Sequence, residues 1–375
     1  MKAGWQTKKL GDICDFEGGS QPPKSEFIYD ERIGYVRFLQ IRDFGSDKNI
    51  TYIRESKKNR LCCEEDILIG RYGASVGKIL GNKAGAYNVA LMKTMPNLSI
   101  VDRRWFHKFL LSEEFQTPLL NIADRSAQAG FSKDDIYDFP VPVPPLSEQR
   151  RIVAILDEAF EGIATAKANT EKNLQNAREL FESHAKRVFS QGAGHWPTKT
   201  IDEISTNFDS KRVPITKCDR KAGEFPYYGA SGIVDYVADY IFDGDTLLIS
   251  EDGANLLARS TPIAFSVSGR YWVNNHAHIL KFDHMATQRF VELFLESIPL
   301  DEYITGAAQP KLNQKALNSI PIPIPVSVDE QAQVVGRLEI VADQSELLQA
   351  AYERKLAALD ELKRSLLHQA FSGAL

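Results

Sequence analysis

Residues 140–149 read Pro-Val-Pro-Val-Pro-Pro-Leu-Ser-Glu-Gln, and a near-copy of this segment returns between residues 321 and 331. The second copy reads Pro-Ile-Pro-Ile-Pro and reaches its own Glu-Gln pair after an insertion of one residue. In each copy a run without proline follows, to Ser190 and to Ser372 respectively. Because proline strips favour extended backbone and Ser or Asp then stands where an N-cap belongs, the pattern predicts, twice, an extended arm that leads into a long helix.

The duplication extends over the rest of the chain. Trp5–Ile13 resembles Trp196–Ile204, and Asp66–Ile69 resembles Asp245–Ile249. Runs of β-branched and aromatic residues bounded by Gly, Asn and Asp predict strands in both copies, and each copy has a short amphipathic helix. We therefore predict mixed α/β domains at 1–146 and 191–328, with long helices at 147–190 and 329–375. Further matched pairs are Gly73-Ala74 with Gly253-Ala254, Asn88–Ala90 with Asn275–Ala277, Gln128 with Gln309, and Phe189-Ser190 with Phe371-Ser372.

The two predicted helices carry a coiled-coil pattern. A run of 44 residues without proline, such as 147–190, would extend about 66 Å as a helix. Pairing the helices antiparallel within one chain would bury both apolar stripes and give a pseudo-two-fold, cyclic fold whose two ends lie together; a coiled coil between chains is the alternative. The predicted seam comprises Leu338, Val341, Leu348, Tyr352, Leu356, Leu359, Leu366 and Ala370 on the second helix, and Leu156, Ala159, Ala166, Thr170, Leu174, Ala177, His184 and Val188 on the first.

The amino-acid composition and net charge exclude several classes of protein. The chain has 375 residues, of which 43% are hydrophobic and 25% charged, and this balance excludes disordered and low-complexity classes. Its net charge of -5 argues against a protein that holds nucleic acid by bulk charge alone. The four cysteines lack the spacing of a disulfide framework or zinc site, and no apolar run approaches membrane-spanning length. We therefore expect a cytoplasmic protein that does not insert into a membrane.

Motifs for catalysis are missing from the sequence. Gly73–Lys78 resembles a phosphate-binding loop but is one residue short, and Ile79 replaces the Ser or Thr that would hold magnesium. His276 and His278 lie two residues apart on a predicted strand, where a polar pair is a better interpretation than a metal site. Neither a base-methylating motif nor a Gly-x-Ser-x-Gly elbow occurs. We predict no catalytic residue and no bound metal, and expect any chemistry to reside on a partner.

Two stretches of this sequence carry a family resemblance. Phe131–Ile136, followed by Pro140–Asp157 with its Pro-Pro-Leu-x-Glu-Gln motif, resembles the end of a target-recognition domain in specificity subunits of type I restriction-modification systems. Tyr228–Asp235 and Tyr240–Asn255 resemble the same family, and the likeness covers essentially the whole chain. The second copy departs from the pattern at Val326–Asp329, where one residue is inserted before the Glu-Gln pair.

The resemblance implies an α+β fold and a DNA-recognition subunit without catalytic activity. Each target-recognition domain would read one half of a bipartite target on double-stranded DNA, and the helices would set the gap between the halves. Two methyltransferase (modification) subunits would dock on the helices, and a restriction and translocation subunit would join them. S-adenosylmethionine, ATP and magnesium would be held by those partners, with no cofactor on this chain. The candidate partner-binding residues are Glu148, Gln149, Glu330 and Gln331.

Candidate DNA contacts follow from the chemistry of the phosphate backbone and of the base edges in the major groove. Lys and Arg suit phosphate contacts, whereas Arg, Lys, Asn, Gln, Glu and Ser on loops can read base edges in the major groove. Basic runs and Gly-rich segments supply such residues in both domains. Gln128 and Gln309 could instead brace the arm against its domain. The candidates are Ser20, Gln21, Lys24, Lys57, Lys58, Arg71, Tyr72, Ser75 and Gln128 in the first domain, and Lys211, Arg212, Tyr228, Ser231, Glu251, Asn255, Gln309 and Lys311 in the second.

Two other classes of function remain open from the sequence. The chain could be a coiled-coil scaffold that organises protein partners, with flanking domains that bind peptide or carbohydrate. It could also be a nuclease or transferase that acts alone, which predicts turnover by the isolated chain with metal or methyl donor.

Overall fold

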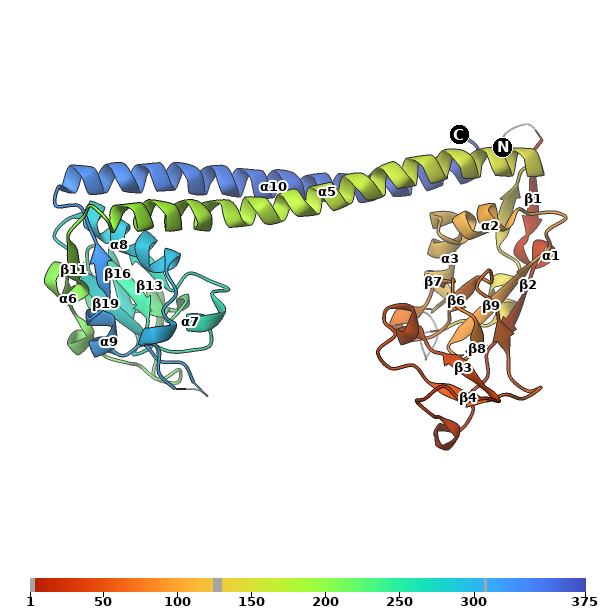
Figure 1. The fold of residues 1–375 in the computed structure, drawn as a ribbon, viewed down its shortest axis with the longest axis horizontal. Coiled ribbons are helices and arrows are strands. Elements are labelled where there is room, and N and C mark those ends of the chain that lie inside the picture. Colours follow the sequence, from red (N-terminus) through yellow and green to blue (C-terminus); the bar gives the residue numbers. More distant parts are fainter. Residues whose placement is uncertain (1–3, 124–129, 307–308) are drawn as a thin grey trace. The chain divides into compact units, whose positions relative to one another are not determined.

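The computed structural model describes residues 4–123, 130–306 and 309–375, and the chain divides into two compact units (Figure 1). Unit 1 consists of residues 1–170 with 355–375, and unit 2 consists of residues 171–354. Two long helices, α5 (Leu146–Gly192) and α10 (Val328–Ser372), each contribute one half to each unit. The long helices predicted after the two proline strips are confirmed. Among the described residues, no helix is long and apolar enough to span a bilayer.

The helices pair antiparallel within each unit. In unit 1, Lys167 of α5 forms an ion pair with Asp360 of α10 at 2.7 Å. In unit 2, the hydroxyl of Ser345 donates to the carbonyl oxygen of Ala177 at 2.6 Å. Ser345 is buried, whereas Leu348, predicted in the seam, is 41% exposed. The prediction for Leu348 was wrong because the face that meets α5 passes through Ser345 and the half-buried Gln349 in this stretch.

Unit 1 contains two four-stranded sheets and a small two-stranded one. Their strand orders are β2-β9-β6-β7, β4-β3-β8-β5 and β1-β10. The strands are β1 (Gln6–Lys9), β2 (Cys14–Gly18), β3 (Tyr35–Leu39), β4 (Tyr52–Arg54), β5 (Leu61–Cys62), β6 (Leu68–Gly70), β7 (Ile79–Leu80), β8 (Gly85–Tyr87), β9 (Leu91–Pro96) and β10 (Pro140–Val143). The helices are α1 (Leu10–Ile13), η1 (Lys24–Glu26), η2 (Ile41–Phe44), η3 (Gly73–Ser75), α2 (Arg103–Leu110), α3 (Glu113–Ala123) and α4 (Lys133–Ile136).

Unit 2 repeats this topology strand for strand. Its orders are β12-β19-β16-β17, β14-β13-β18-β15 and β11-β20. The strands are β11 (Thr198–Thr200), β12 (Thr206–Asn207), β13 (Ala222–Gly229), β14 (Gly232–Val237), β15 (Phe242–Asp243), β16 (Thr246–Ser250), β17 (Ala264–Val267), β18 (Arg270–Val273), β19 (Ala277–Lys281) and β20 (Pro321–Pro323). The helices are α6 (Ile201–Ile204), η4 (Asp209–Lys211), α7 (Asn255–Ala258), α8 (Met285–Ser297), η5 (Asp301–Tyr303) and α9 (Gln314–Asn318).

The paired strands fix which residues are equivalent between the units. Gly70 pairs with Leu91, and Ser250 pairs with Ala277, at the same place in the two sheets. Counting back from these pairs makes Asn88 equivalent to Asn274. Both amides act alike, since the Oδ1 of Asn88 accepts from the N–H two residues later at 3.1 Å and the Oδ1 of Asn274 does so at 2.7 Å. The predicted match of Asn88 with Asn275 was therefore wrong by one residue.

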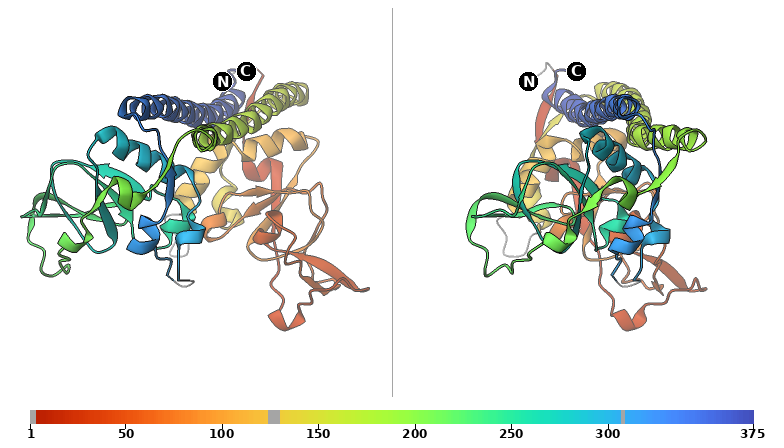
Figure 2. Two further views of the ribbon diagram at one scale, coloured as in Figure 1. Left: turned by 60° about the vertical axis from the view of Figure 1, so that its left-hand side comes forward. Right: turned by 90° about the vertical axis from the view of Figure 1, so that its left-hand side faces the viewer.

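In each unit one helix of the domain, α2 in unit 1 and α8 in unit 2, packs against the long helix pair. In unit 2, α8 lies between the helix pair and the sheets (Figure 2). Phe189 of α5 packs edge-on against Phe290 and Phe294 of α8, with ring centroids 5.3 and 5.2 Å apart. In unit 1, Phe371 of α10 packs against Trp105 and Phe109 of α2. Trp5 and Leu375, from opposite parts of the sequence, both pack against the main core cluster of this unit.

Ion pairs also connect these two domain helices, α2 and α8, to the long helices. Arg104 and Lys108 of α2 both contact Asp157 of α5, the lysine at 2.8 Å. In unit 2, Arg289 of α8 contacts Glu339 of α10 at 2.8 Å. The two acids occupy equivalent places in the repeat, so the framework that attaches a domain to the helix pair is duplicated in both its apolar and its charged contacts.

Candidate nucleic-acid interface

A groove in unit 1 brings together two separate sets of candidate DNA contacts. The segment after β2 contributes Ser20 and Gln21, and the loop after β4 contributes Lys58. The cavity between them has a volume of about 660 Å³. We call it the unit 1 groove. The other residues that line it are Pro22, Pro23, Glu26, Tyr35, Ile53, Arg54, Ser56 and Asn59.

The unit 1 groove offers the mixture of groups that DNA requires. Arg54 and Lys58 are exposed cations suited to phosphate oxygens, and Gln21 and Asn59 carry amides that can pair with base edges. Each amide is held by a local bond: Gln21 donates to the carbonyl oxygen of Pro22 at 3.2 Å, and Asn59 donates to that of Arg54 at 3.0 Å. These bonds restrain the two amides at the edge of the cavity.

Two candidates from the first domain, Lys24 and Lys57, neighbour groove residues in the sequence. Lys24 begins η1 and Lys57 precedes the groove residue Lys58, and both lysines are exposed. Asn59 and Tyr35 of the groove were missed by sequence reasoning. The signal for Asn59 was its place next to the Lys57-Lys58 run, whereas Tyr35 gave no signal, because an aromatic residue on a predicted strand is ordinarily core.

Arg71 and Tyr72 form a second surface in unit 1. The guanidinium of Arg71 lies over the ring of Tyr72, 5.0 Å from its centroid, and its Nε donates to the carbonyl oxygen of Phe131 at 3.2 Å. Tyr72 is 40% exposed and pairs with Gly130 in an isolated bridge. Ser75 closes the η3 turn by donating to the carbonyl oxygen of Tyr72 at 2.6 Å. Gln128 lies outside the described residues.

The equivalent place in unit 2 has the opposite charge. Strand register makes Glu251 the counterpart of Arg71, and Asp252 bridges to Lys311 as Tyr72 bridges to Gly130. The carboxylate of Glu251 contacts Arg212 at 2.6 Å and Lys311 at 3.1 Å. Arg212 and Glu251 are 14% and 12% exposed in their side chains, so these two candidates are internal partners of each other rather than free DNA contacts. Lys311, half-exposed, remains at the surface.

The same network holds a histidine and a second acid. His278 is buried; its Nδ1 lies 2.5 Å from the Oδ2 of Asp209 and its Nε2 lies 2.8 Å from the carbonyl oxygen of Leu312. Burial of Asp209 raises the pKa of its carboxyl, but the hydrogen bond and charge of His278 outweigh this and leave that pKa below its usual value. Burial also raises the pKa of the Glu251 carboxyl. The hydrogen bond from Arg212 and the charge of His278 lower it by more, so this pKa is likewise below its usual value.

Ligand atoms of Asp209, Glu251 and His278 lie within 4.8 Å of one another, which is a spacing that metal sites use. Here, however, Arg212 and Lys311 already contact the same carboxylates. A divalent cation would have to displace two cations and a histidine proton, so the donor set fits an ion-pair network better than a metal centre.

The other candidates of unit 2 are spread over several loops. Lys211 is exposed, with its Nζ 3.7 Å from the ring centroid of Phe208, and Ser231 lies exposed in the turn between β13 and β14. Gln309 is exposed. Tyr228 is half-buried, edge-on to Tyr271, and burial raises the pKa of its phenol.

Asn255 differs from these exposed candidates because it braces its own loop. Its Oδ1 accepts from the backbone N–H of Thr261 at 3.0 Å, and its Nδ2 donates to the carbonyl oxygen of the same residue at 2.9 Å. The hydroxyl of Ser260 also donates to this Oδ1, at 3.0 Å. The amide is therefore engaged inside the unit, and the candidate DNA contact at Asn255 is a structural residue.

The candidate partner-binding residues divide into exposed and buried ones. Gln149 has no exposed surface and Gln331 has 5%, so neither is available for a docked subunit; both are structural. The guanidinium of Arg151 donates to both carboxylate oxygens of Glu148, at 2.7 and 2.9 Å. Glu330 is exposed and accepts from the indole N–H of Trp196 at 3.1 Å.

Comparison with known proteins gives a consistent picture. Residues 2–176 and 194–355 match the family described as type I restriction modification DNA specificity domain. A putative type I restriction enzyme specificity subunit, S.HindORF215P of Haemophilus influenzae, is 35% identical over 141 residues, 38% of this chain and 36% of that relative's length. The MjaVIII specificity subunit of Methanocaldococcus jannaschii is 20% identical over 99% of this chain and 93% of its own.

Two solved structures share the fold. A chain from a study of complex assembly and conformational transition in the type I R-M system aligns with a TM-score of 0.80 and 16% identity, over 100% of this chain and 99% of that one. The HsdS subunit from Thermoanaerobacter tengcongensis aligns with a TM-score of 0.64 and 17% identity, over 100% of this chain and 98% of its own. At these identities the likeness concerns the fold alone.

Proposed function

Because the chain belongs to the type I restriction-modification DNA specificity family, we propose that its two units read the two halves of a bipartite DNA target. The chain is the DNA-recognition subunit of such a system. Unit 1 would contact its half-site through the unit 1 groove and the Arg71-Tyr72 surface. Unit 2 would use Lys211, Ser231, Gln309 and Lys311, which are its exposed candidates.

One observation supports two different half-sites. The units have the same strand order throughout, yet equivalent positions differ in chemistry: Arg71 lies over the exposed Tyr72 in unit 1, whereas its counterpart Glu251 is held in an ion-pair network with Arg212 and Lys311. A duplicated framework with different polar side chains is what two readers of unlike sequences need, because base edges present different donor and acceptor patterns. A single palindromic target would instead favour two like surfaces.

The proposal assigns the helices and the partners separate tasks. α5 and α10 would set the gap between the half-sites and dock two modification subunits, and a restriction and translocation subunit would join that core. This chain would hold no cofactor, catalyse nothing, and act in the cytoplasm, where its free thiols suit reducing conditions. S-adenosylmethionine would be held by the modification subunits, and ATP and magnesium by the partners as well. With a net charge of -5, the chain alone would bind DNA weakly.

Sequencing of methylated sites in cells that carry this chain with its modification subunit tests the proposal. The expected result is a bipartite motif with a fixed gap. Deleting equal numbers of residues from the middle of both helices should change the gap and leave both half-sites unchanged. A contiguous motif in the wild type, or half-sites that change with helix length, would contradict the proposal. Turnover by the isolated chain would contradict its non-catalytic role.

A further inference from the structure

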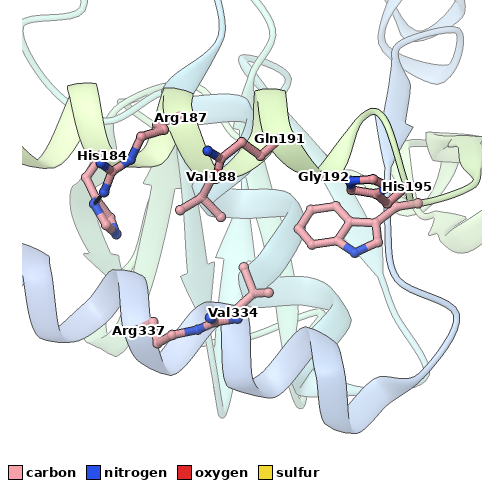
Figure 3. Close-up of a pocket in the computed structure, with 9 residues that line it drawn as sticks. His184, Arg187, Val188, Gln191, Gly192, His195, Val334 and Arg337 are labelled. Atoms are coloured by element: carbon pink, nitrogen blue, oxygen red, sulfur yellow. Dashed lines mark hydrogen bonds between the residues drawn. The ribbon is translucent and has the colours of Figure 1, made fainter.

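A second cavity, of about 400 Å³, lies in unit 2 between the two long helices (Figure 3). α5 lines it with His184, Arg187 and Gln191, and α10 lines it with Arg337. Val188 and Val334 point toward one another across its floor (Figure 3). We call it the helix pocket. Its wall is completed by Trp196, where the chain turns back after α5.

The end of α5 is built to keep Trp196 in this wall. A Cβ on Gly192 would lie 2.1 Å from the indole ring, so only glycine leaves room for the ring at this position. The indole N–H donates to Glu330 at 3.1 Å, which fixes the plane of the ring. This bond also engages the carboxylate of Glu330, the acid that lies near the pocket.

The two arginines of the helix pocket have no acidic partner. Within the described parts of the chain, neither Arg187 nor Arg337 lies within 4.0 Å of a carboxylate oxygen, although many other arginines here do. Arg187 donates to the Nδ1 of His184 at 3.0 Å, and the Nε of Arg337 donates to the carbonyl oxygen of Gln333 at 3.2 Å. Two guanidiniums and an exposed histidine, His195, therefore line one cavity, and none of the residues that line it is an acid.

The equivalent place in unit 1 is neutral. The repeat puts Leu366 opposite His184, Gln369 opposite Arg187 and Ile155 opposite Arg337. Nothing in the common framework requires arginine here, because unit 1 folds the same way with these residues. The positive charge thus occurs once per chain, which points to a contact that unit 2 makes and unit 1 does not.

We propose that the helix pocket binds an acidic segment of one modification subunit, with an apolar side chain of that segment against the partly exposed Val188 and Trp196. This inference rests on the proposed function. A protein occupant suits the pocket because Val188 and Trp196 give its lining an apolar part beside the two arginines. Binding of a modification subunit at unit 2 then depends on the charge of this pocket, whereas binding at unit 1 does not. Rising salt removes the unit 2 copy first, since salt screens exposed charges.

The test compares complexes of the chain with its modification subunit by native mass spectrometry and sedimentation over a series of salt concentrations. The variant is R187E/R337E, and its matched control is K186E/R354E, which makes the same charge change on the same helices outside the pocket. We expect R187E/R337E to bind one modification subunit fewer than the wild type at low salt, with affinity at unit 2 lowered roughly tenfold or more. The control keeps the wild-type ratio. R187Q/R337Q, which is uncharged at these positions, gives an intermediate loss and guards against misfolding of the reversal variant.

Each alternative outcome has a separate meaning. If the wild type binds no modification subunit, the proposed function fails. If the wild type assembles and R187E/R337E matches it at every salt concentration, the inference is overturned. It is also overturned if assembly is unchanged while binding to a duplex of the target sequence weakens, because the pocket would then be a phosphate site.

Discussion

The side-chain amide of Gln149 donates to the carbonyl oxygen of Pro144 at 2.8 Å, from a position without exposed surface. The same amide donates to the carbonyl oxygen of Ile100 at 3.0 Å and accepts from the backbone N–H of Asp102 at 2.7 Å. One side chain thus holds together the proline arm, the start of α5 and the segment that begins α2. Gln331 repeats the bond to the arm, donating to Pro325 at 2.7 Å.

Replacing Gln149 by leucine should therefore destabilise unit 1. The change removes the partner of one buried carbonyl oxygen, one partly buried carbonyl oxygen and one partly buried N–H, and we expect a loss of about 3 kcal/mol in the free energy of unfolding. Urea unfolding followed by circular dichroism measures this loss. Gln344→Leu, at an exposed position of α10, is the matched control. Equal losses for the two variants would contradict a bracing role for Gln149.

Replacing Phe371 by alanine should loosen α10 from unit 1. The ring is 2% exposed and lies 5.5 Å from Trp105 and 5.6 Å from Phe109 between centroids, so its removal leaves a cavity among aromatic residues. We expect a loss of about 4 kcal/mol in unfolding free energy. Leu347→Ala removes a 69% exposed side chain from the same helix and should cost little. Thermal unfolding of both variants provides the comparison.

The sequence predicted the long helices and the duplicated order of elements well, because proline strips, caps and apolar spacing are local signals. It predicted the buried contacts poorly. Glu251 and Arg212 lie 39 positions apart and meet through strand register, which no local pattern reveals. Gln149 was assigned to a partner because its motif is specific to the family, whereas its burial depends on residues around position 100. Groove residues Gln21 and Lys58 were identified from their chemistry, but their proximity comes from the packing of two loops.

Stability of unit 2 should fall in acid. Asp209 and Glu251 have folded-state pKa values below those of the unfolded chain, so they contribute stability above the unfolded values, near 4, and lose it as pH falls through the lower folded values. Urea midpoints measured from pH 7 down to about 2 should show Asp209→Asn destabilised at neutral pH, with its deficit shrinking toward the acid end. Asp343→Asn, at an exposed position, should follow the wild type throughout. A constant deficit for Asp209→Asn would contradict the ionic role.

Lys58→Ala should weaken DNA binding by the assembled complex for every sequence alike. If Lys58 contacts one phosphate, the slope of log affinity against log salt should fall in magnitude by about 1. Fluorescence anisotropy with a target duplex and a scrambled duplex measures both quantities. Lys172→Ala, at an exposed position of α5, should leave the slope unchanged.

Gln21→Ala should alter sequence preference in one half-site only. Loss of an amide that pairs with a base edge relaxes discrimination at that position by about 1 to 3 kcal/mol. Mapping of methylated sites for the variant complex shows which positions relax, and the half-site read by unit 2 serves as the internal control. Relaxation in both halves, or in neither, would exclude a base contact by Gln21.

The division of the chain also bears on its synthesis. Unit 2 is one continuous stretch, residues 171–354, whereas unit 1 combines residues 1–170 with 355–375. As the chain emerges from the ribosome, unit 2 has all its parts while the core of unit 1 still lacks Leu367, Ala370 and Phe371. The core of unit 1, although most of it is translated first, can therefore be completed only after the last residues are made, and until then Trp105 and Phe109 lack the ring of Phe371 that packs on them.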